Sequence, residues 1–344
     1  MHSHTQLDRR GRWQSVPYAL AVGVLLAIAG AGCAAVTPAA TSAVAAAETD
    51  TGTADGGDAA ASASDAAVAA DLAAAVDVAP APPAVAAYPG ECPNFNGTSV
   101  ALAVGGINRN LLITMPSEPN GAGVLFLWHG LGDNAKNFNG AFGAKQLAAK
   151  LNVIVVTPDV CCNTKGAESC CSQLTGWHFT ASPESDVGIF DGALSCLGQQ
   201  FNVDRKRVYT MGFSAGGLWS TWLVMNRSQQ LAAAAVLSGG INDYNPWTLP
   251  TAKVPVIDAS GGPGDQFGGG VVDFQTSTEV FNKKLRAAGH FVVHCQHQQG
   301  HTITSEIASY AAAFLADHAW TPDGTSPLAA GLPKSAPSAC KILP

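Results

Sequence analysis

The feature that most constrains this chain is a Gly-x-Ser-x-Gly turn between a strand pattern and a helix pattern. Gly212, Ser214 and Gly216 follow the β-type run at 207–210 and precede an apolar helical pattern over 218–225. A turn this tight excludes side chains beside the serine, so the serine hydroxyl stands clear of the backbone. The following helix directs free N–H groups toward an incoming substrate. The alternative is a glycine-rich connection with an incidental serine, but the strand–helix context favours a nucleophile.

Residues 1–33 resemble an export signal. A basic region near the start contains Arg9, Arg10 and Arg12. The apolar segment that follows, 16–28, is too short to span a bilayer comfortably. Small residues then lead to Cys33, which in a bacterial lipoprotein signal becomes the lipidated residue. The usual leucine three residues earlier is replaced by Gly30, so an ordinary secretory peptide is the alternative. We therefore expect an exported protein, anchored to a membrane through lipid on Cys33 or freely secreted.

Residues 34–87 are dominated by alanine, contain no aromatic residue and end in the proline-rich run 80–83. No apolar stripe with helical spacing is sustained there. Such a segment buries too little surface to offset the entropy lost on ordering. We expect a disordered Ala/Asp/Pro-rich linker that acts as a tether. The remaining residues, 88–344, are expected to form one catalytic domain.

The cysteine count supports an exported domain. Beyond Cys33 the chain has eight cysteines, at positions 92, 161, 162, 170, 171, 196, 295 and 340. An even number in an exported chain predicts up to four disulfides, although sequence does not choose the pairing. The adjacent cysteines do not match the spacing that wraps zinc, so no metal or cofactor is expected. A net charge of −7 and the lack of Lys/Arg clusters after residue 13 argue against a nucleic-acid partner.

From residue 88 onward, strand and helix patterns alternate. Strands are expected at 99–104, 110–115, 123–128, 153–157, 207–211, 233–237, 254–259 and 291–295. Helices are expected at 141–151, 186–201, 218–225, 280–288 and 306–318. This order predicts an α/β fold with a mostly parallel central sheet and helices on both faces.

A serine hydroxyl is a poor nucleophile, so Ser214 needs a base that a carboxylate orients. When a Gly-x-Ser-x-Gly turn lies in such a sheet, the chain order is Ser, then Asp or Glu, then His. His301 lies in the loop after the strand at 291–295, from which a histidine can reach Ser214. His297 in the same loop is the alternative base. His294 lies inside the strand pattern and is expected to be structural.

The acid is expected in the loop after the strand at 254–259. Asp265 ends the run Gly-Gly-Pro-Gly-Asp in that loop, a turn-forming context. Asp273 is the alternative, and Asp258 lies inside the strand, where an aspartate is more often structural. An aspartate in a glycine-rich loop can also serve only an Asx turn.

Attack by the serine creates an oxyanion, which two preorganised N–H groups must stabilise. Ala215, directly after Ser214, supplies one donor in this arrangement. Leu131 is the predicted second donor and Gly130 the alternative, because both lie in the loop after the strand at 123–128. Glycine in that loop lets the backbone approach the substrate closely.

Histidine 129 opens the same loop and is a candidate on the substrate-binding side. His129 precedes Ser214 in the chain, so we expect it to brace the loop by hydrogen bonding rather than to act as the base.

Together these residues resemble the α/β-hydrolase superfamily, and more narrowly its secreted polyhydroxybutyrate depolymerase-like and feruloyl esterase-like esterases. The resemblance extends over roughly residues 98–318 and is most specific over 204–217. Its other marks are Arg109, the run 128–130 and Asp186-Val187. It implies an α/β-hydrolase fold in which Ser214, Asp265 and His301 are the nucleophile, acid and base. It also implies an ester substrate, small or polymeric.

The resemblance places Trp177 near an aromatic position of the family, where it would line the acyl pocket; a core tryptophan is the alternative. Two other functions remain open. The run 131–134 is similar to carboxylesterase/phospholipase-like thioesterases. The long linker is compatible with a surface-tethered binding protein that keeps a catalytically inactive hydrolase fold.

Overall fold

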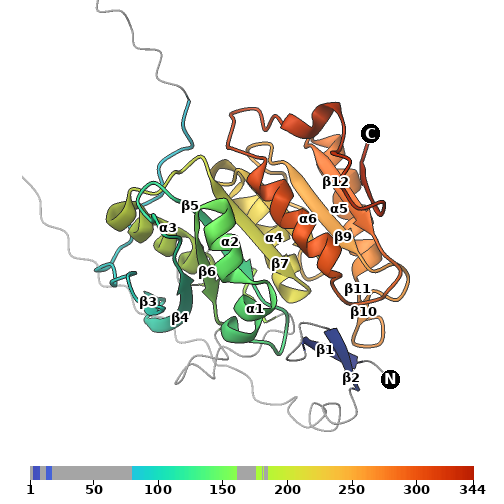
Figure 1. Cartoon of the computed structure of the whole chain (residues 1–344), viewed down its shortest axis with the longest axis horizontal. Helices are drawn as coiled ribbons and strands as arrows, with labels where there is room; N and C mark the ends of the chain where they lie inside the picture. The colour runs from blue at the N-terminus through green and yellow to red at the C-terminus, as the bar shows by residue number, and fades with distance from the viewer. Residues whose placement is uncertain (1–2, 8–12, 18–79, 161–175, 180, 182–184) are drawn as a thin grey trace, which may run out of the picture. The chain divides into compact units, whose positions relative to one another are not determined.

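A computed structural model describes residues 3–7, 13–17, 80–160, 176–179, 181 and 185–344 (Figure 1). The chain divides into two units, Met1–Val78 and Ala79–Pro344. In the first unit, β1 (Ser3–Leu7) and β2 (Trp13–Pro17) pair antiparallel. Residues 18–28 of the expected apolar signal segment, Cys33 and residues 34–79 of the expected linker lie outside the described residues. Within the described residues, none of the helices has the length and apolarity needed to span a bilayer.

The second unit is built on a nine-stranded sheet with the order β13-β12-β9-β8-β7-β5-β6-β4-β3. Its strands are β3 (Ser99–Val104), β4 (Ile107–Thr114), β5 (Gly123–Trp128), β6 (Val153–Pro158), β7 (Val208–Phe213), β8 (Ala233–Leu237), β9 (Val256–Ser260), β12 (Val292–Gln296) and β13 (Cys340–Ile342). The six central strands pair in parallel, and the pairs at both edges are antiparallel. A separate small hairpin joins β10 (Gln266–Phe267) to β11 (Val272–Asp273). The mostly parallel sheet is as predicted.

Helices cover both faces of this sheet (Figure 1). They are α1 (Ala135–Ala141), α2 (Ala144–Leu151), α3 (Val187–Phe201), α4 (Ala215–Asn226), α5 (Phe274–Ala287) and α6 (Ser305–Ala316), with short 3-10 turns η3 (Ser228–Gln230) and η4 (Pro327–Ala330). One apolar cluster joins the sheet to α1, α2 and α6, and another joins it to α3, α4 and α5. In β5, Val124 and Phe126 belong to one cluster while Leu125 and Leu127 belong to the other. Successive side chains therefore feed opposite faces, as expected for a buried parallel strand.

Two helices differ from the sequence-based expectation. The single helix predicted over 141–151 is the end of α1 followed by α2, with Gly143 between them at φ 60°. The helix predicted over 280–288 begins earlier, at Phe274. Its first turn contains weak helix formers, but the side chain of Asp273 caps it by accepting the N–H of Thr276 at 2.8 Å. At the N-terminus of α5, the capping interaction of Asp273 therefore outweighs the low helix propensity of the first turn.

Two disulfides are present in the described residues, in agreement with the prediction that cysteines pair. Cys92 bonds to Cys196 and so links the segment before β3 to α3. Cys295 bonds to Cys340, which lies directly opposite it across the β12–β13 pair. The four cysteines between positions 161 and 171 lie outside the described residues.

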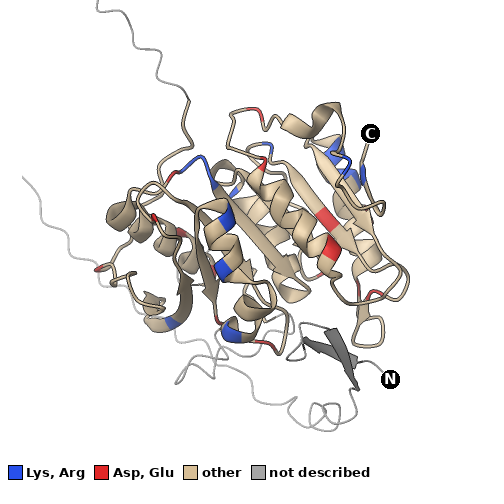
Figure 2. Cartoon of the chain, in the orientation of Figure 1, with Lys and Arg blue, Asp and Glu red and all other residues tan. Residues whose placement is uncertain are grey.

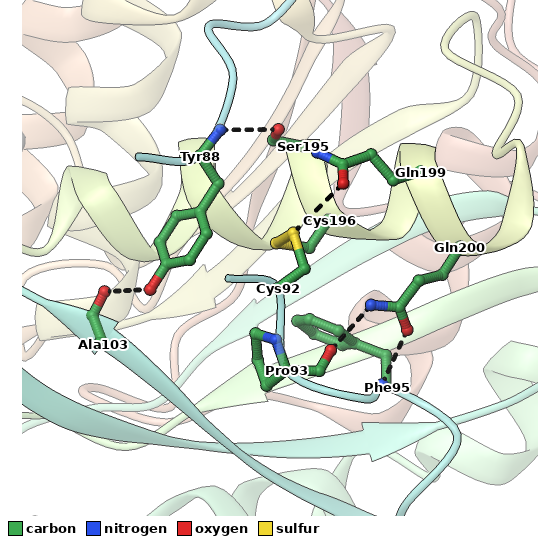
Figure 3. Close-up of a disulfide and its surroundings, with 9 residues drawn as sticks. All are labelled: Tyr88, Cys92, Pro93, Phe95, Ala103, Ser195, Cys196, Gln199 and Gln200. Carbon is green, nitrogen blue, oxygen red and sulfur yellow. Dashed lines mark hydrogen bonds between the residues drawn. A yellow bond between two sulfur atoms is a disulfide. The ribbon is translucent and has the colours of Figure 1, made fainter. Parts of the chain in front are cut away.

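Hydrogen bonds around the first disulfide join the segment that leads into β3 to α3 and to β3 itself (Figure 3). The N–H of Tyr88 donates to Ser195 Oγ at 3.0 Å, and the Tyr88 hydroxyl donates to the carbonyl of Ala103 at 2.6 Å. The side chain of Gln200 accepts the N–H of Phe95 at 3.0 Å. Residues just after the expected linker are thus part of the folded unit.

A buried ion pair holds the first turn of α3. Arg109 on β4 pairs with Asp186, and both side chains are shielded from solvent. Asp186 also accepts the N–H of His178 at 2.7 Å. Burial opposes ionisation of Asp186, but the hydrogen bonds from His178 and the charge of Arg109 prevail and hold its pKa below the usual value. This ionised carboxylate stabilises the fold above about pH 4, and the contribution is lost as pH falls through the lowered pKa.

Replacing Arg109 by Met should lower the free energy of unfolding by about 3–5 kcal/mol, because it leaves a buried carboxylate without its partner. Urea unfolding at neutral pH measures this change. Arg227→Met is the matched control. Arg227 also pairs with an aspartate of α3, Asp191, but both side chains of this pair are about a quarter exposed. Its cost should be at most about 1 kcal/mol. Equal effects of the two substitutions would contradict the role given to the buried pair.

Candidate functional site: a serine, a histidine and an aspartate at the carboxyl edge of the sheet

Ser214 occupies a strained turn between β7 and α4. Its backbone has φ 58° and ψ −120°, a conformation that L residues rarely adopt. Neighbouring glycines are required on steric grounds. A Cβ atom on Gly216 would lie 1.9 Å from the carbonyl oxygen of Trp128, and one on Gly212 would lie 2.2 Å from the carbonyl oxygen of Gly216. The turn therefore has the geometry that the sequence motif predicts.

Three side chains from separate loops form a hydrogen-bonded line. The Oγ atom of Ser214 lies 2.8 Å from Nε2 of His301, and Nδ1 of His301 lies 2.6 Å from Oδ1 of Asp265. These residues follow β7, β9 and β12, all parallel members of the central sheet. The carboxyl ends of parallel strands meet at one edge, which is why residues so distant in sequence converge there.

Asp265 is fully buried and its second oxygen is also bound. Oδ2 accepts the hydroxyl of Ser238 at 2.8 Å and the N–H of Gly261 at 2.7 Å. With both oxygens engaged, the carboxylate is fixed in one orientation toward His301. Ser238 was not among the residues predicted from the sequence. Its position directly after β8, beside Gly239, is the sequence feature that could have indicated a role at the carboxyl edge of the sheet.

The imidazole of His301 lies between two aromatic rings. Phe274 stacks on it with centroids 4.5 Å apart, and Phe213 stacks with centroids 4.8 Å apart. These rings limit rotation of the imidazole out of the line between Asp265 and Ser214. Neither phenylalanine was predicted, although Phe213 is part of the Gly-x-Ser-x-Gly turn itself.

The alternative acid and base occupy other positions. Asp273 caps α5, as described above. Nδ1 of His297 accepts the N–H of Gln299 at 3.2 Å, and burial lowers the pKa of this histidine. His294 pairs with Asp258 inside the sheet, 2.5 Å apart. Of the histidines and aspartates considered from the sequence, His301 and Asp265 are the ones brought into line with Ser214.

The loop after β5 lies against the serine turn. A Cβ atom on Gly130 would lie 3.3 Å from Cβ of Ser214, so the two backbones are in close approach. His129 is fully buried, and its Nδ1 lies 2.8 Å from the carbonyl oxygen of Gly130. Burial lowers the pKa of His129, which keeps the ring neutral. Its Nε2 can then accept the N–H of Val160 at 3.4 Å, so His129 links the loop after β5 to the end of the segment after β6.

Trp177 is also fully buried. This burial agrees with the alternative given above, that Trp177 is a core tryptophan. Its indole N–H donates to the carbonyl of His129 at 3.0 Å, and its ring packs edge-on against Trp128 with centroids 5.1 Å apart. Asp186 binds the next residue, His178. A chain of contacts thus runs from the buried ion pair on α3 to the loop beside Ser214.

Comparison with known proteins agrees with this architecture. No protein-family model matches the chain. Feruloyl esterase D of Neurospora crassa is 27% identical over 158 residues, which are 42% of this chain and 50% of that esterase. The match therefore spans about half of the relative's own length.

Two solved structures share the fold. The crystal structure of native sOPH has a TM-score of 0.57 at 18% identity and covers 75% of this chain and 97% of that one. Native pOPH has a TM-score of 0.55 at 18% identity and covers 70% of this chain and 91% of that one. The chain therefore has an α/β-hydrolase fold, as predicted, and part of it is similar in sequence to a feruloyl esterase.

Proposed function

We propose that this protein is an exported serine esterase that cleaves carboxylic esters through an acyl-enzyme intermediate. The single observation that carries the proposal is the hydrogen-bonded line from Ser214 through His301 to Asp265. Similarity to a feruloyl esterase supports ester chemistry.

In the proposed reaction, His301 Nε2 takes the proton of Ser214 as its Oγ attacks the ester carbonyl. Asp265 holds the imidazole in the correct orientation and stabilises the positive charge that forms there. His301 then gives the proton to the departing alcohol, leaving an acyl group on Ser214. Water repeats the sequence, with His301 again as the base, and releases the acid. Thioesters would react by the same steps with a thiol as leaving group, so a thioesterase remains the alternative.

Ala215 and Leu131 are the proposed donors to the oxyanion. Ala215 is the first residue of α4, so its N–H has no acceptor within the helix. The geometry of the Gly130–Leu131 peptide bond supports the N–H of Leu131 as the second donor. The carbonyl of Gly130 binds His129 and the N–H of Asp133, on one side of the loop. In a trans peptide the carbonyl and the following N–H point in opposite directions, so the N–H of Leu131 is directed away from those partners.

The substrate is proposed to be an ester, small or polymeric, with the feruloyl esterase-like and polyhydroxybutyrate depolymerase-like classes as the candidates. Trp177 and His129 are proposed to act on substrate binding indirectly, by shaping the loop that carries Leu131, since both are buried. No nucleic-acid partner is proposed.

Export is supported by the disulfides Cys92–Cys196 and Cys295–Cys340, because disulfides persist in oxidising compartments. Lipid attachment at Cys33 and a tethering role for the linker are proposals that rest on the sequence alone. Globomycin-sensitive processing and labelling with radioactive palmitate would distinguish a lipoprotein from a secreted enzyme.

Replacing Ser214 by Ala should lower kcat for short p-nitrophenyl acyl esters by at least about 10⁴-fold, because the nucleophile is removed. Thermal unfolding should be nearly unchanged, since the variant loses only a hydroxyl at the edge of the sheet. Substantial ester hydrolysis by the purified variant would remove Ser214 from the mechanism.

Replacing Leu131 by Pro should lower kcat by about 10²–10³-fold, because proline has no backbone N–H to donate to the oxyanion. Leu131→Ala is the matched control: it shortens the same side chain but keeps the N–H. Steady-state kinetics with one p-nitrophenyl ester compares the two, and circular dichroism checks folding. If the alanine variant loses as much kcat as the proline variant, the side chain rather than the N–H is what matters.

A further inference from the structure

Ser238 has a backbone conformation that serine rarely adopts. Four residues other than glycine have a positive φ in the part of the chain that the structure describes. Asn152 and Asn202 are two of them; they end α2 and α3, where asparagine is readily accommodated. The other two are Ser214, the proposed nucleophile, at φ 58°, and Ser238 at φ 45°. Such strain persists only where the surrounding contacts impose it, and it occurs most often at functional sites.

Glycine would relieve this strain, and glycine fills the next two positions. A Cβ atom on Gly239 would lie 2.4 Å from Cγ1 of Val236, and one on Gly240 would lie 2.3 Å from the carbonyl oxygen of Ser277. These two positions therefore exclude a side chain. Ser238 does carry one, and the residue is 2% exposed. Of the three residues that follow β8, Ser238 alone can contribute a side chain to the site.

The hydroxyl of Ser238 contacts the proposed acid. It donates to Oδ2 of Asp265 at 2.8 Å, and the N–H of Gly261 donates to the same oxygen at 2.7 Å. The other carboxylate oxygen, Oδ1, lies 2.6 Å from Nδ1 of His301. Two donors that reach Oδ2 from different segments oppose rotation of the carboxylate, because hydrogen bonds are directional. Gly261 alone would hold the oxygen but leave the carboxylate freer to turn.

Among the described residues, no lysine or arginine forms an ion pair with this carboxylate. Asp265 is fully buried, and its ion-pair partner is His301. The sequence has no Lys or Arg between Lys253 and Lys283, and the β10–β11 region directly after Asp265 carries no blue in Figure 2. A buried carboxylate must replace its lost hydration with hydrogen bonds. The hydroxyl of Ser238 is one of the two donors that bind Oδ2.

The end of β8 also contacts the nucleophile turn. The carbonyl of Leu237 accepts the N–H of Ser214 at 3.0 Å. The N–H of the next residue, Ser238, donates to the carbonyl of Ala259 on β9 at 2.8 Å. Two consecutive residues therefore bind the backbone of the nucleophile, the strand that leads to the acid, and the acid itself. Ser238 is placed to set the orientation of Asp265 relative to Ser214.

We propose that Ser238 is a positioning residue for ester cleavage, whose hydroxyl holds Asp265 in the orientation that aligns His301 with Ser214. This inference rests on the proposed function, because it takes these last three residues as the catalytic line. It explains the strained backbone: the left-handed conformation directs the hydroxyl to Asp265 and serves the reaction rather than the stability of the fold. Activity should therefore depend on the hydroxyl, whereas stability should depend on how well residue 238 tolerates a positive φ.

Three substitutions in the full-length protein separate these two effects. Ser238→Ala removes the hydroxyl, Ser238→Gly removes the hydroxyl and the strain, and Ser238→Thr keeps a hydroxyl while adding a β-branch. The alanine and glycine variants should both lose about 10–100-fold in kcat for a short p-nitrophenyl ester, because the acid is no longer held in place. Their KM should change little, since Ser238 is buried. The threonine variant should keep most of the wild-type kcat.

Thermal unfolding should rank the variants differently. Ser238→Gly should unfold at a higher temperature than Ser238→Ala, and Ser238→Thr at the lowest, because a positive φ is easiest for glycine and hardest for a β-branched residue. Ser228→Ala is the matched control. Ser228 is also a buried serine, and its Oγ accepts the N–H groups of Thr251 and Ala252, each at 3.1 Å. Loss of this hydroxyl should lower the unfolding temperature and leave kcat unchanged.

Proton NMR of the same proteins gives a measurement that needs no turnover. The proton that joins Nδ1 of His301 to Oδ1 of Asp265 should give a far-downfield resonance in the wild-type protein. This resonance should shift or broaden in Ser238→Ala and stay in place in Ser228→Ala, because only the first substitution frees the carboxylate.

A wild-type kcat in folded Ser238→Ala, or an unchanged downfield resonance, would overturn the proposal. It would also be overturned if kcat followed the unfolding temperature across the variants instead of the hydroxyl. Should Ser238→Thr fail to fold, the alanine and glycine variants decide: equal kcat with unequal stability supports the proposal, and a higher kcat in the more stable variant contradicts it. Undiminished hydrolysis by Ser214→Ala would instead overturn the proposed function, and the NMR comparison would still test the contact between Ser238 and Asp265.

Discussion

The close approach of α4 to the ends of the neighbouring strands is the constraint on which the rest of the site depends. At Gly216 the helix backbone touches the carbonyl at the end of β5, and at Gly217 it touches the carbonyl at the end of β8, where a Cβ atom would lie 2.5 Å from Leu237 O. These contacts fix Ser214 at the carboxyl edge with a positive φ. The same two strands then lead into the loop of Leu131 and into Ser238. One steric requirement therefore positions three residues: Ser214, the proposed oxyanion donor Leu131, and Ser238, which donates a hydrogen bond to Asp265.

A second His–Asp pair in the same sheet shows why position matters more than residue type. Asp258 and His294 also connect β9 to β12, with the same separation of 36 residues as Asp265 and His301. Burial raises the pKa of Asp258 despite the hydrogen bond from His294. Burial acts to lower the pKa of His294, but the hydrogen bond from Asp258 prevails and raises it. This pair lies within β9 and β12, where Asn282 of α5 contacts both side chains, and not in the loops beyond the strand ends that carry Asp265 and His301. It is therefore in a position to stabilise the sheet rather than to contact the serine.

Much of this arrangement follows from local sequence. Continuous apolar runs identify the buried strands, and the glycines around Ser214 identify the turn, because each depends on residues close in the chain. The choice of Asp265 and His301 as acid and base follows from the order of the strands, because each lies in the loop after a strand that succeeds Ser214 in the chain. The rest depends on contacts between distant segments: Phe274 reaches His301, Ser238 reaches Asp265, and Arg109 reaches Asp186. Periodicity and spacing carry no information on which side chains meet across the sheet, and so these partners emerge only from the fold. The early start of α5 similarly depends on one capping residue, Asp273, in a region of weak helical propensity.

The central claim is that Ser214 is activated only within the folded arrangement of His301 and Asp265. Labelling with a fluorophosphonate, followed by intact-mass measurement and peptide mapping, tests this claim most directly. Folded protein should gain one adduct, located at Ser214, and protein unfolded in urea should gain none. Absence of an adduct on the folded protein, or an adduct on another residue, would contradict the account and favour an inactive hydrolase fold.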